Sequence, residues 1–574
     1  MTWIEDLLDR ALADHQAGRL DAAEQGYREV LTADPVHADA LHLLGVLAHQ
    51  SARTETAIEL IERAIALRPD TMHFHNNLGN ILRDTGRAAD AVACYRRALA
   101  LNPDTSELHH NLAKALLALG TFAEAEIAFR RALDLDPDRI DTWNDFGNLL
   151  TDTGQNEAAI ACFSAVLSRR PDDARAYNNL GRALVGQDRY AEAVQQFSAA
   201  LRVKPDYVNA WFNLGSALDV LRQWDGAANC WQKVLELAPD DAEAHVSRAL
   251  MLLKVGRLKE GWPGMQWFRY LRWKNDDNLD MEFPLPTWNG EDIGDQPLVL
   301  YADQGLGDAI QFCRYVSLCA RYARIILVVP RSLHRLFTQL EGVSDVVSGP
   351  PLPQSYVHCP LSELPRIFET DLGNIPTTVP YLWADRQQST AWRERFAPLT
   401  GLRVGLVWAG NPKYLGDRKR SIPLERLVSS VNLPGLHLIS LQKGEAAHQI
   451  QPLQGPVTVH NWMDEVEDLA STAALIDGLD LVVGVDTGVI HLAAALGKPV
   501  WLLNRLDTDW RWLLDREDSP WYPTLRLFRQ ARAGDWEEPL RRLREELRRL
   551  AARGEMQPPS RQARDASVLL GSSR

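Results

Sequence analysis

The sequence predicts an all-helical superhelix followed by an α/β domain built from two Rossmann-like halves. Seven prolines recur every 34 residues through nearly half of the 574-residue chain. They are Pro35, Pro69, Pro103, Pro137, Pro171, Pro205 and Pro239. After a polar connection between Asn275 and Pro297 this period ends, and short β-branched runs alternate with helical stretches. That alternation is typical of α/β domains.

The 34-residue unit has the length of a tetratricopeptide (TPR) repeat, a pair of antiparallel helices. Each proline ends a second helix, because it cannot extend the hydrogen-bond ladder. Small residues at two fixed offsets allow neighbouring helices to approach closely. They are Ala23, Ala57, Ala91, Ala125, Ala159, Ala193 and Ala227, and then Gly45, Gly79, Gly147, Gly181 and Gly215. We predict a TPR superhelix over residues 1–275, whose imperfect terminal unit from Ala242 onward seals it against the next domain.

One polar series runs along the first helices of the repeats, which line the concave side in this fold class. It consists of Asn77, Asn111, Asn179 and Asn213, with Asp145 in the same register. A carboxamide both donates and accepts hydrogen bonds, so a ladder of them suits the backbone of an extended peptide. The alternative is that each side chain bonds a neighbouring helix within the stack.

Composition limits the classes of function. The formal net charge of −14 argues against binding of nucleic acid in bulk, because phosphate contacts require clustered Lys and Arg. The start of the chain lacks the features of a secretion signal, and no apolar run approaches the roughly 20 residues that span a bilayer. The six cysteines include no CxxC pair, which favours reduced core thiols. We therefore expect a cytoplasmic protein without a membrane span.

The second part of the chain divides into a linker (276–296), a first Rossmann-like half (297–388), a second half (389–535), a helix (536–553) and a disordered tail (554–574). The first half opens with the strand, glycine loop and helix of PLVLYADQGLGDAIQFCRYV. The second opens at LRVGLVWAGN. Ligands of such sheets bind at the carboxyl ends of the strands, so the loops there are the candidate sites.

The loop QGLGD (304–308) matches neither the dinucleotide fingerprint nor a P-loop. Gly305 and Gly307 permit close backbone approach, and Asp308 stands in the first turn of the following helix. Asp308 is predicted either to cap that helix or to act as a general base on an acceptor hydroxyl.

The segment DTGVIHLAAALGKPV (486–500) predicts a strand end, a turn at Thr487 and Gly488, and a helix with His491 in its first turn. Free N–H groups, a hydroxyl and an imidazole there suit a diphosphate. Asp486 is expected to orient the loop, because a carboxylate facing a diphosphate would repel it. For His491 the alternative is a histidine packed under the loop.

A basic cluster in the segment 408–427 supplies the remaining donor candidates. Arg420 is the first choice to stabilise a leaving nucleoside diphosphate, and a solvated loop is the alternative. Trp408 and Asn411 belong to the same predicted donor site, while Gln442 and Lys443 are candidates for recognition of the base. DTD (507–509) is predicted to be a loop away from Asp308, and we predict no metal and no cofactor besides a nucleotide-sugar co-substrate.

QGLGDAIQFCRYV, YVHCPLSELP, RSIPLERL and DTGVIHLAAALGKPVWLL resemble glycosyltransferase family 9, the ADP-heptose heptosyltransferases, in a form fused to TPR repeats. The resemblance covers roughly residues 297–535. It implies a metal-independent GT-B fold, with the family's base at Asp308 and its donor loop at Asp486, Thr487, Gly488 and His491. Arg420 stands where the family has a lysine, so the resemblance does not extend to heptose specificity.

The TPR arm also resembles that of O-GlcNAc transferase, and the architecture resembles bacterial TPR-fused flagellin glycosyltransferases. The leading hypothesis is transfer of a sugar to a Ser or Thr hydroxyl of a protein, possibly a flagellin, held by the concave face. Two alternatives stay open. One is transfer to a lipid or polysaccharide, and the other is a scaffold with a degenerate, non-catalytic transferase domain.

Overall fold

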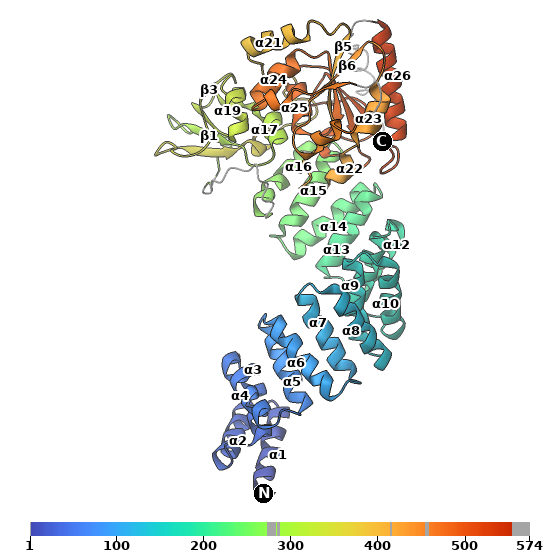
Figure 1. The fold of residues 1–574 in the computed structure, drawn as a ribbon. Helices are drawn as coiled ribbons and strands as arrows, with labels where there is room; N and C mark the ends of the chain where they lie inside the picture. Colours follow the sequence, from blue (N-terminus) through green and yellow to red (C-terminus); the bar gives the residue numbers. More distant parts are fainter. Residues whose placement is uncertain (1, 272–282, 284–286, 414–415, 454–457, 554–574) are drawn as a thin grey trace. The chain divides into compact units, whose positions relative to one another are not determined.

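The computed structural model describes residues 2–271, 283, 287–413, 416–453 and 458–553 (Figure 1). The chain forms two compact units, Met1–Leu237 and Ala238–Arg574, and each is described by itself. The predicted linker lies partly outside the described residues, and the predicted tail (554–574) lies wholly outside them. Within these residues, no helix combines the length and the apolar character needed to cross a membrane.

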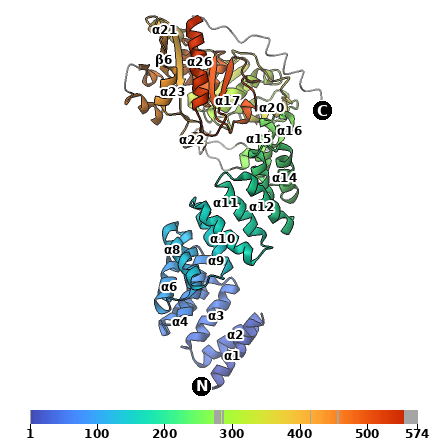
Figure 2. The same cartoon turned by 90° about the vertical axis from the view of Figure 1, so that its right-hand side faces the viewer.

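The first unit is a stack of antiparallel helix pairs, in which each pair is one predicted repeat (Figures 1 and 2). This confirms the TPR superhelix. The helices are α1 (Thr2–Gln16), α2 (Leu20–Ala33), α3 (Ala38–Gln50), α4 (Thr54–Leu67), α5 (Met72–Asp84), α6 (Ala88–Leu101), α7 (Ser106–Ala118), α8 (Phe122–Leu135), α9 (Ile140–Asp152), α10 (Asn156–Arg169), α11 (Ala174–Val185), α12 (Tyr190–Val203), α13 (Val208–Val220) and α14 (Trp224–Leu237).

The glycine series sits where the two helices of a pair touch. A Cβ atom on Gly181 would lie 2.4 Å from Cε1 of Phe197, and one on Gly79 would lie 2.8 Å from Cε1 of Tyr95. Both aromatic rings are fully buried. The small residue and the ring therefore fill one space together, which explains why both recur with the period.

The repeat prolines also take part in contacts between successive repeats. The indole N–H of Trp143 donates to the carbonyl of Pro137, and that of Trp211 donates to Pro205, each at 2.8 Å. His109 bonds the carbonyl of Pro103 in the same way. A ring six residues after the proline thus satisfies a carbonyl at the end of the preceding helix.

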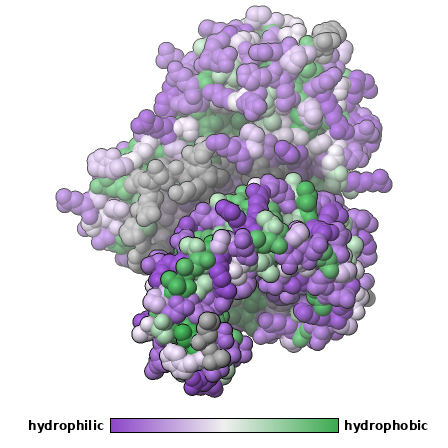
Figure 3. Space-filling view, turned by 60° about the horizontal axis from the view of Figure 1, so that its bottom comes forward, coloured by the Kyte–Doolittle hydropathy of each residue, from purple (hydrophilic) through white to green (hydrophobic). Residues whose placement is uncertain are grey.

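Single large apolar side chains remain exposed on the first unit, and several stand two residues before a repeat proline. These include Leu67, Leu101, Val203 and Leu237. The face drawn in Figure 3 is mostly hydrophilic, with hydrophobic side chains in small separate groups. Isolated exposed apolar residues of this kind are ordinary and indicate no binding site.

The second unit begins with the imperfect terminal repeat, α15 (Ala242–Lys254), α16 (Leu258–Met265) and the short 3-10 helix η1 (Gln266–Tyr270). This terminal repeat packs against the α/β part. Trp262 of α16 is 2% exposed, donates its indole N–H to the carbonyl of Thr370 at 2.8 Å, and meets Trp510 and Trp521 edge to face.

The first α/β half contains a parallel sheet in the order β3-β2-β1-β4. Its strands are β1 (Leu298–Tyr301), β2 (Ile325–Val328), β3 (Val343–Val347) and β4 (Val357–Pro360). Its helices are α17 (Leu306–Phe312), η2 (Cys313–Tyr315), α18 (Val316–Cys319), α19 (Arg331–Phe337), η3 (Leu361–Glu363) and α20 (Leu364–Ile367). Leu298 is paired with Ile325 on one side and Val357 on the other, so β1 lies inside the sheet, and its first three residues are buried.

The second half contains a parallel sheet in the order β10-β9-β8-β5-β6-β7. Counted from β5, this is the doubly wound order 3-2-1-4-5-6 read in reverse. The strands are β5 (Leu402–Val407), β6 (Leu436–Ser440), β7 (Val459–His460), β8 (Leu481–Val485), β9 (Val500–Asn504) and β10 (Leu525–Arg529). The two sheets confirm the predicted α/β fold.

Helices cover both faces of the second sheet (Figure 1). Val483 and Val485 of β8 face a core with α23 (Leu424–Val431) and α26 (Glu537–Arg553), while Val482 faces one with α24 (Leu469–Asp477) and α25 (Gly488–Ala495). The second core continues into the first half, so the halves share packed apolar surface. The other helices are α21 (Arg386–Phe396), α22 (Asp417–Arg420), η4 (Glu445–Ile450), η5 (Met463–Glu465) and η6 (Trp510–Trp512). Of these, α21 spans the predicted boundary between the halves and packs on α24.

Candidate functional site

The candidate site lies at the carboxyl ends of the strands where the order of each sheet reverses, between β1 and β4 and between β5 and β8. Open α/β sheets bind ligands at such switch points. Asp303 and Ser362 follow β1 and β4, while Trp408 and Asp486 follow β5 and β8. The helices α17 and α25 start from these loops and pack against each other.

The glycine loop before α17 brings the two halves into direct contact. A Cβ atom on Gly307 would lie 3.1 Å from Cδ2 of His491 and 3.7 Å from Cα of Gly488. Gly305 is the N-cap residue of α17, and a Cβ atom there would lie 3.3 Å from Oδ2 of Asp308. The predicted close backbone approach is therefore found at Gly307, where the loop of the first half contacts His491 and Gly488 of the second half.

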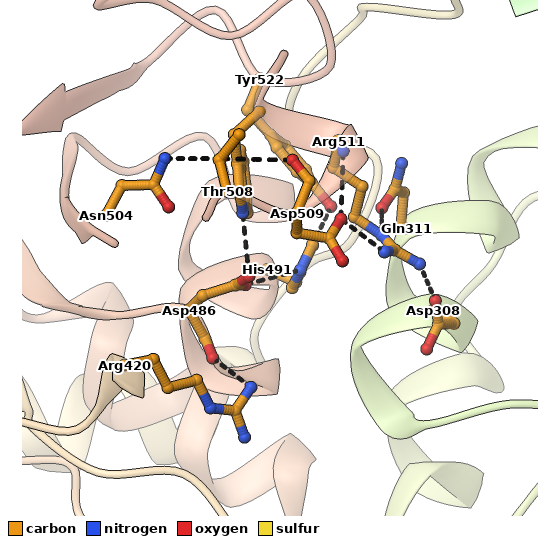
Figure 4. Close-up of polar contacts among 11 residues, drawn as sticks. Asp308, Gln311, Arg420, Asp486, His491, Asn504, Thr508, Asp509, Arg511 and Tyr522 are labelled. Atoms are coloured by element: carbon orange, nitrogen blue, oxygen red, sulfur yellow. Dashed lines mark hydrogen bonds and ion pairs between the residues drawn. The ribbon is translucent and has the colours of Figure 1, made fainter. Parts of the chain in front are cut away.

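Asp308 stands in the first turn of α17 without capping it, because no side chain caps this helix. Its Oδ1 atom forms an ion pair with Arg511 of the second half (Figure 4). Its side chain is 21% exposed. Among the described residues, no group donates a hydrogen bond to Oδ2, so one carboxylate oxygen remains for a substrate.

Asp486 is held by a tryptophan of η6 and faces the histidine of α25. Its Oδ2 atom accepts the indole N–H of Trp512 at 2.9 Å, and its Oδ1 atom lies 3.7 Å from Nε2 of His491. Burial opposes ionisation of this carboxyl. The hydrogen bond and charge of His491, the Trp512 N–H and the Arg420 cation outweigh that effect and lower its pKa to about 2.

His491 is 4% exposed and held on both sides of its ring. Its Nδ1 atom bonds the hydroxyl of Tyr522 at 2.8 Å, and its Nε2 atom faces Asp486 (Figure 4). The ring thus fills the base of the loop, as the packed alternative describes, while it also touches the glycine loop at Gly307.

Thr487 caps α25 with its backbone, but its hydroxyl is buried and has no hydrogen-bond partner among the described residues. Burying a hydroxyl without a partner costs roughly 1–3 kcal/mol. The first N–H groups of α25 and its partial positive charge point into the same loop. An anion at this helix end would satisfy both the hydroxyl and the N–H groups.

Arg420 lies beside this helix end. Its Nη1 atom donates to the carbonyl of Asp486 at 2.8 Å, and its Nε atom donates to Oδ1 of Asp417 at 2.9 Å. The side chain is 19% exposed. Gly410 makes room for it, because a Cβ atom there would lie 2.1 Å from Nη2 of Arg420. The loop 408–411 (WAGN loop) therefore packs directly against Arg420 of the basic segment, at the position of Gly410.

Two residues predicted to contact the donor, Trp408 and Gln442, are buried and have other partners. Trp408 is fully buried in the core next to α23, so its indole faces apolar side chains rather than a ligand, which corrects that prediction. Gln442 is 4% exposed. Its Oε1 atom accepts the backbone N–H groups of Trp408 and Ala409, and its Nε2 atom donates to the carbonyls of Ala409 and Lys443. It therefore holds the WAGN loop and does not read a base.

Asn411 and Lys443 are exposed and have local partners. Oδ1 of Asn411 accepts the backbone N–H of Lys413 at 3.0 Å, and Nζ of Lys443 bonds the carbonyl of Val466. Both lie on loops at the carboxyl edge of the second sheet. Their predicted contacts with a donor remain predictions.

Sequence reasoning missed the segment that joins the two halves, η6. Trp510 packs on the first half, Trp512 bonds Asp486, and Arg511 between them reaches Asp308. Asp509 accepts from Nη1 of Arg511 at 2.8 Å, so the DTD loop shares an arginine with Asp308. The prediction that this loop lies away from Asp308 is therefore wrong. The available signal was an arginine between two tryptophans just after a strand.

Asp303 is a second carboxylate that sequence reasoning missed. Ser362 donates its hydroxyl to Oδ2 at 2.5 Å and its N–H to Oδ1 at 3.3 Å. Burial raises the pKa of Asp303 to about 6 despite these bonds, and the charge of nearby Asp308 adds to the rise. Its position in the loop that follows β1 was the available signal.

Within the described ranges, no three or more His, Cys, Asp or Glu side chains are placed to hold a metal ion together. Metal independence remains a prediction.

In the first unit, the polar series forms cross-repeat contacts with a constant spacing of 35 residues. Nδ2 of Asn111 donates to Oδ1 of Asn76 at 3.1 Å, and Nδ2 of Asn213 donates to Oδ1 of Asn178 at 2.9 Å. Asn77 bonds His42, and Asp145 lies 3.6 Å from His110. Asn179 instead accepts from its neighbour Asn178.

These contacts match the within-stack alternative for the amide N–H groups of Asn77, Asn111 and Asn213. Nothing in the described part of the chain donates to Oδ1 of Asn111 or Asn213. Each of these oxygens, on the first helix of its repeat, can therefore still accept a hydrogen bond.

The chain matches known families in both units. Tetratricopeptide repeat profiles match residues 8–71, 76–140, 144–208, 179–224 and 208–241. A profile described as glycosyltransferase family 9 (heptosyltransferase) matches residues 453–503, which contain β8, the Asp486 loop and α25.

Protein FlbA of Caulobacter vibrioides is 28% identical over 344 residues, which cover 55% of this chain and 56% of that protein. The chain thus spans little more than half the length of this curated relative.

Solved structures are similar only to part of the chain. The crystal structure of MamA protein covers 29% of it at 23% identity and a TM-score of 0.28. YrrB, described as a TPR protein with an unusual peptide-binding site, covers 34% at 21% identity and a TM-score of 0.30. The chain covers 92% of the first protein and 100% of the second. These scores are too low to support an argument about function.

Proposed function

We propose that this chain is a GT-B glycosyltransferase that moves a sugar from a nucleotide-sugar donor to a hydroxyl of a protein without a metal ion. The observation that carries the proposal is the meeting of α17 and α25 at the switch points of two Rossmann-like sheets. It puts a carboxylate with one free oxygen beside a helix end suited to a diphosphate. The match of residues 453–503 to glycosyltransferase family 9 supports the same chemistry.

In the proposed reaction, Oδ2 of Asp308 takes the proton of the acceptor hydroxyl while its oxygen forms a bond to the anomeric carbon. The bond from that carbon to the nucleoside diphosphate breaks, and its electron pair leaves with the diphosphate. Arg420, the hydroxyl of Thr487 and the N–H groups of α25 stabilise the negative charge that develops. Asp486 and His491 hold the loop in shape.

The TPR unit would present the acceptor as an extended polypeptide. The free Oδ1 atoms of Asn111 and Asn213 would accept backbone N–H groups, while their Nδ2 atoms stay bonded within the stack. Flagellin is the first acceptor to test, because the architecture resembles bacterial flagellin glycosyltransferases. The proposed location is the cytoplasm, where nucleotide-sugars are made.

The test is to incubate the full chain with UDP-, GDP-, ADP-, CMP- and dTDP-sugars and purified flagellins, and to measure intact masses. We expect a mass gain equal to one or more sugar residues, and its loss in Asp308→Asn. Asp345→Asn, which changes an exposed carboxylate of the same half, should retain transfer.

The alternatives give different outcomes. No mass gain and no nucleoside diphosphate binding by calorimetry would contradict the proposal and support a scaffold. Donor turnover on lipid or polysaccharide alone would overturn the protein acceptor. Replacement of Asn111, Asn179 and Asn213 by Ala should reduce protein modification without changing hydrolysis of the donor by water; unchanged modification would remove the ladder.

A further inference from the structure

A buried arginine of the second half holds the carboxylate that the proposed function uses as a base. Arg511 is 9% exposed and lies in η6, just after the loop that follows β9. Its guanidinium crosses to α17 of the first half, where it meets both Asp308 and Gln311 (Figure 4). These partners are about 200 residues away in the sequence.

Every nitrogen of the guanidinium has a partner. Nη2 bonds Oδ1 of Asp308, Nη1 bonds Oδ1 of Asp509 at 2.8 Å, and Nε donates to Oε1 of Gln311 at 2.6 Å. The indole of Trp510 covers one face, with its centroid 4.4 Å from Cζ. A buried cation is stable only when it is bonded in this way. The neighbouring carboxylates overcome burial and raise the pKa of Arg511, so it stays charged.

The arrangement fixes Asp308 and Gln311 in defined orientations. An arginine has donors only, so it must face the oxygen of Gln311, and the Nε2 atom of this fully buried glutamine is left without a partner among the described residues. Asp308 is held through Oδ1, which turns Oδ2 toward the glycine loop at Gly305.

We propose that Arg511 is a positioning residue that fixes Asp308 for proton removal and completes the base only when both halves are in contact. This inference rests on the proposed function of Asp308. One arginine thereby links the base on α17 to the segment whose next residue, Trp512, bonds Asp486 in the donor loop. The base and the diphosphate site would then be assembled through a single segment, η6.

A merely structural role is the competing explanation, and the chain contains a matched example of one. Arg314 is also buried and also connects the halves, since its Nη1 atom donates to the carbonyl of Trp521 at 2.7 Å. Its other partners are the carbonyls of Gln311 and Pro376 and the hydroxyl of Tyr381. None of its partners in the described part of the chain is a carboxylate, so it can connect the halves without affecting a base.

The experiment measures kcat and KM for donor turnover by the full chain, with the nucleotide-sugar that gives the mass gain. In Arg511→Met we expect kcat to fall about 100-fold, with KM for the donor within about threefold, because Asp308 loses its fixed orientation while the diphosphate site stays intact. Arg511→Lys should restore only part of kcat, because an ammonium keeps the charge but lacks the fork of a guanidinium.

Arg314→Lys is the control, expected to lower the unfolding temperature while kcat stays within about threefold of the wild type. Gln311→Met provides a second variant that keeps Arg511 and should lower kcat about tenfold, which covers the case in which Arg511→Met does not fold. A wild-type kcat in Arg511→Met or in Gln311→Met, or a fall in Arg314→Lys as large as that in Arg511→Met, would overturn the inference. If Asp308→Asn also turned over donor at the full rate, the proposed function itself would fail.

Discussion

The polar contacts of the two units differ in how far they reach along the chain. In the repeat unit, Asn111 and Asn213 each bond a residue 35 positions earlier, so the partner follows from the period. In the α/β unit, Asp308 pairs with Arg511 across 203 positions. No spacing rule connects those two residues, because the topology of two sheets brings them together.

This difference teaches where each unit should be sensitive to change. A repeat contact has equivalents above and below it, so its loss is felt within neighbouring repeats. A contact such as that of Trp262 or Arg511 belongs to no repeat, so no copy of it follows one period away. Single substitutions in the α/β unit should therefore have larger and more widespread effects than matched substitutions in the repeats.

The largest effect is expected for Trp262→Ala. Trp262 is buried against Trp510 and Trp521 and donates a hydrogen bond to the carbonyl of Thr370. The variant loses both the packing and this bond, so its free energy of unfolding should be about 3–5 kcal/mol lower. Hydrogen exchange of the full chain should show faster exchange in both α16 and η6. Trp3→Ala, at a side chain that is 60% exposed, is the control. Faster exchange confined to α16 would argue against long-range coupling.

The next largest effect is expected for Gly410→Ala. A Cβ atom would lie 2.1 Å from Arg420 and 2.3 Å from Asp417, so the arginine must leave its place beside Asp486. Calorimetry should show about 100-fold weaker binding of the nucleoside diphosphate, or about 2.7 kcal/mol. Gly373→Ala meets no atom within 4 Å and should bind normally. Equal affinities for the two variants would remove Arg420 from the donor site.

The same difference explains how much of the structure the sequence predicted. The helix pairs, the close helix contacts at the glycines, the strand that opens each half and the strand before Asp486 follow from local patterns, because each depends on residues close in sequence or one period away. The loops at Asp308 and Asp486 were also located, since each follows a strand and precedes a helix.

What the sequence did not predict depends on three-dimensional placement. Trp408 was expected at a ligand, but alternation along β5 turns its indole into the core. Arg511 was not considered, because its place between two tryptophans is visible in the sequence but its pairing with Asp308 follows only once α17 is known to lie opposite. The partners of the asparagines were left open, because Nδ2 of an asparagine can donate to a neighbouring repeat while its Oδ1 accepts from a peptide.

Within the repeats, Gly181→Ala should cost about 2 kcal/mol, because the added methyl group overlaps the buried ring of Phe197. The chain offers its own comparison at Ala113, which occupies the same register and is fully buried. Ala113→Gly should cost only about 1 kcal/mol, from helix propensity. Hydrogen exchange should place the loss in α11, α12 and their neighbours. Faster exchange throughout the α/β unit would contradict the local character of repeat contacts.

The smallest effect is expected from acid, acting on the buried histidines of the repeats. Burial lowers the pKa of His110 to about 4, and that of His42 likewise to about 4, against an ordinary value of 6.5. The folded state therefore keeps these rings neutral, and an unfolded chain binds their protons first as pH falls. Their contribution is complete above pH 6.5 and is lost progressively as pH falls toward 4.

Between pH 7.5 and 5.5 we expect His110 to account for about 1 kcal/mol of lost stability around α7 and α9. Hydrogen exchange at the two pH values, corrected for intrinsic rates, should show this loss in the wild type and a smaller one in His110→Gln. His109→Gln, one residue along the same helix, should behave as the wild type. Since Thr142 and Asp145 contact His110 from the next repeat, the loss should stop at that neighbour. A loss of equal size in His110→Gln would exclude His110 as its cause, and a loss that extends into the α/β unit would show that a periodic contact also acts over a long range.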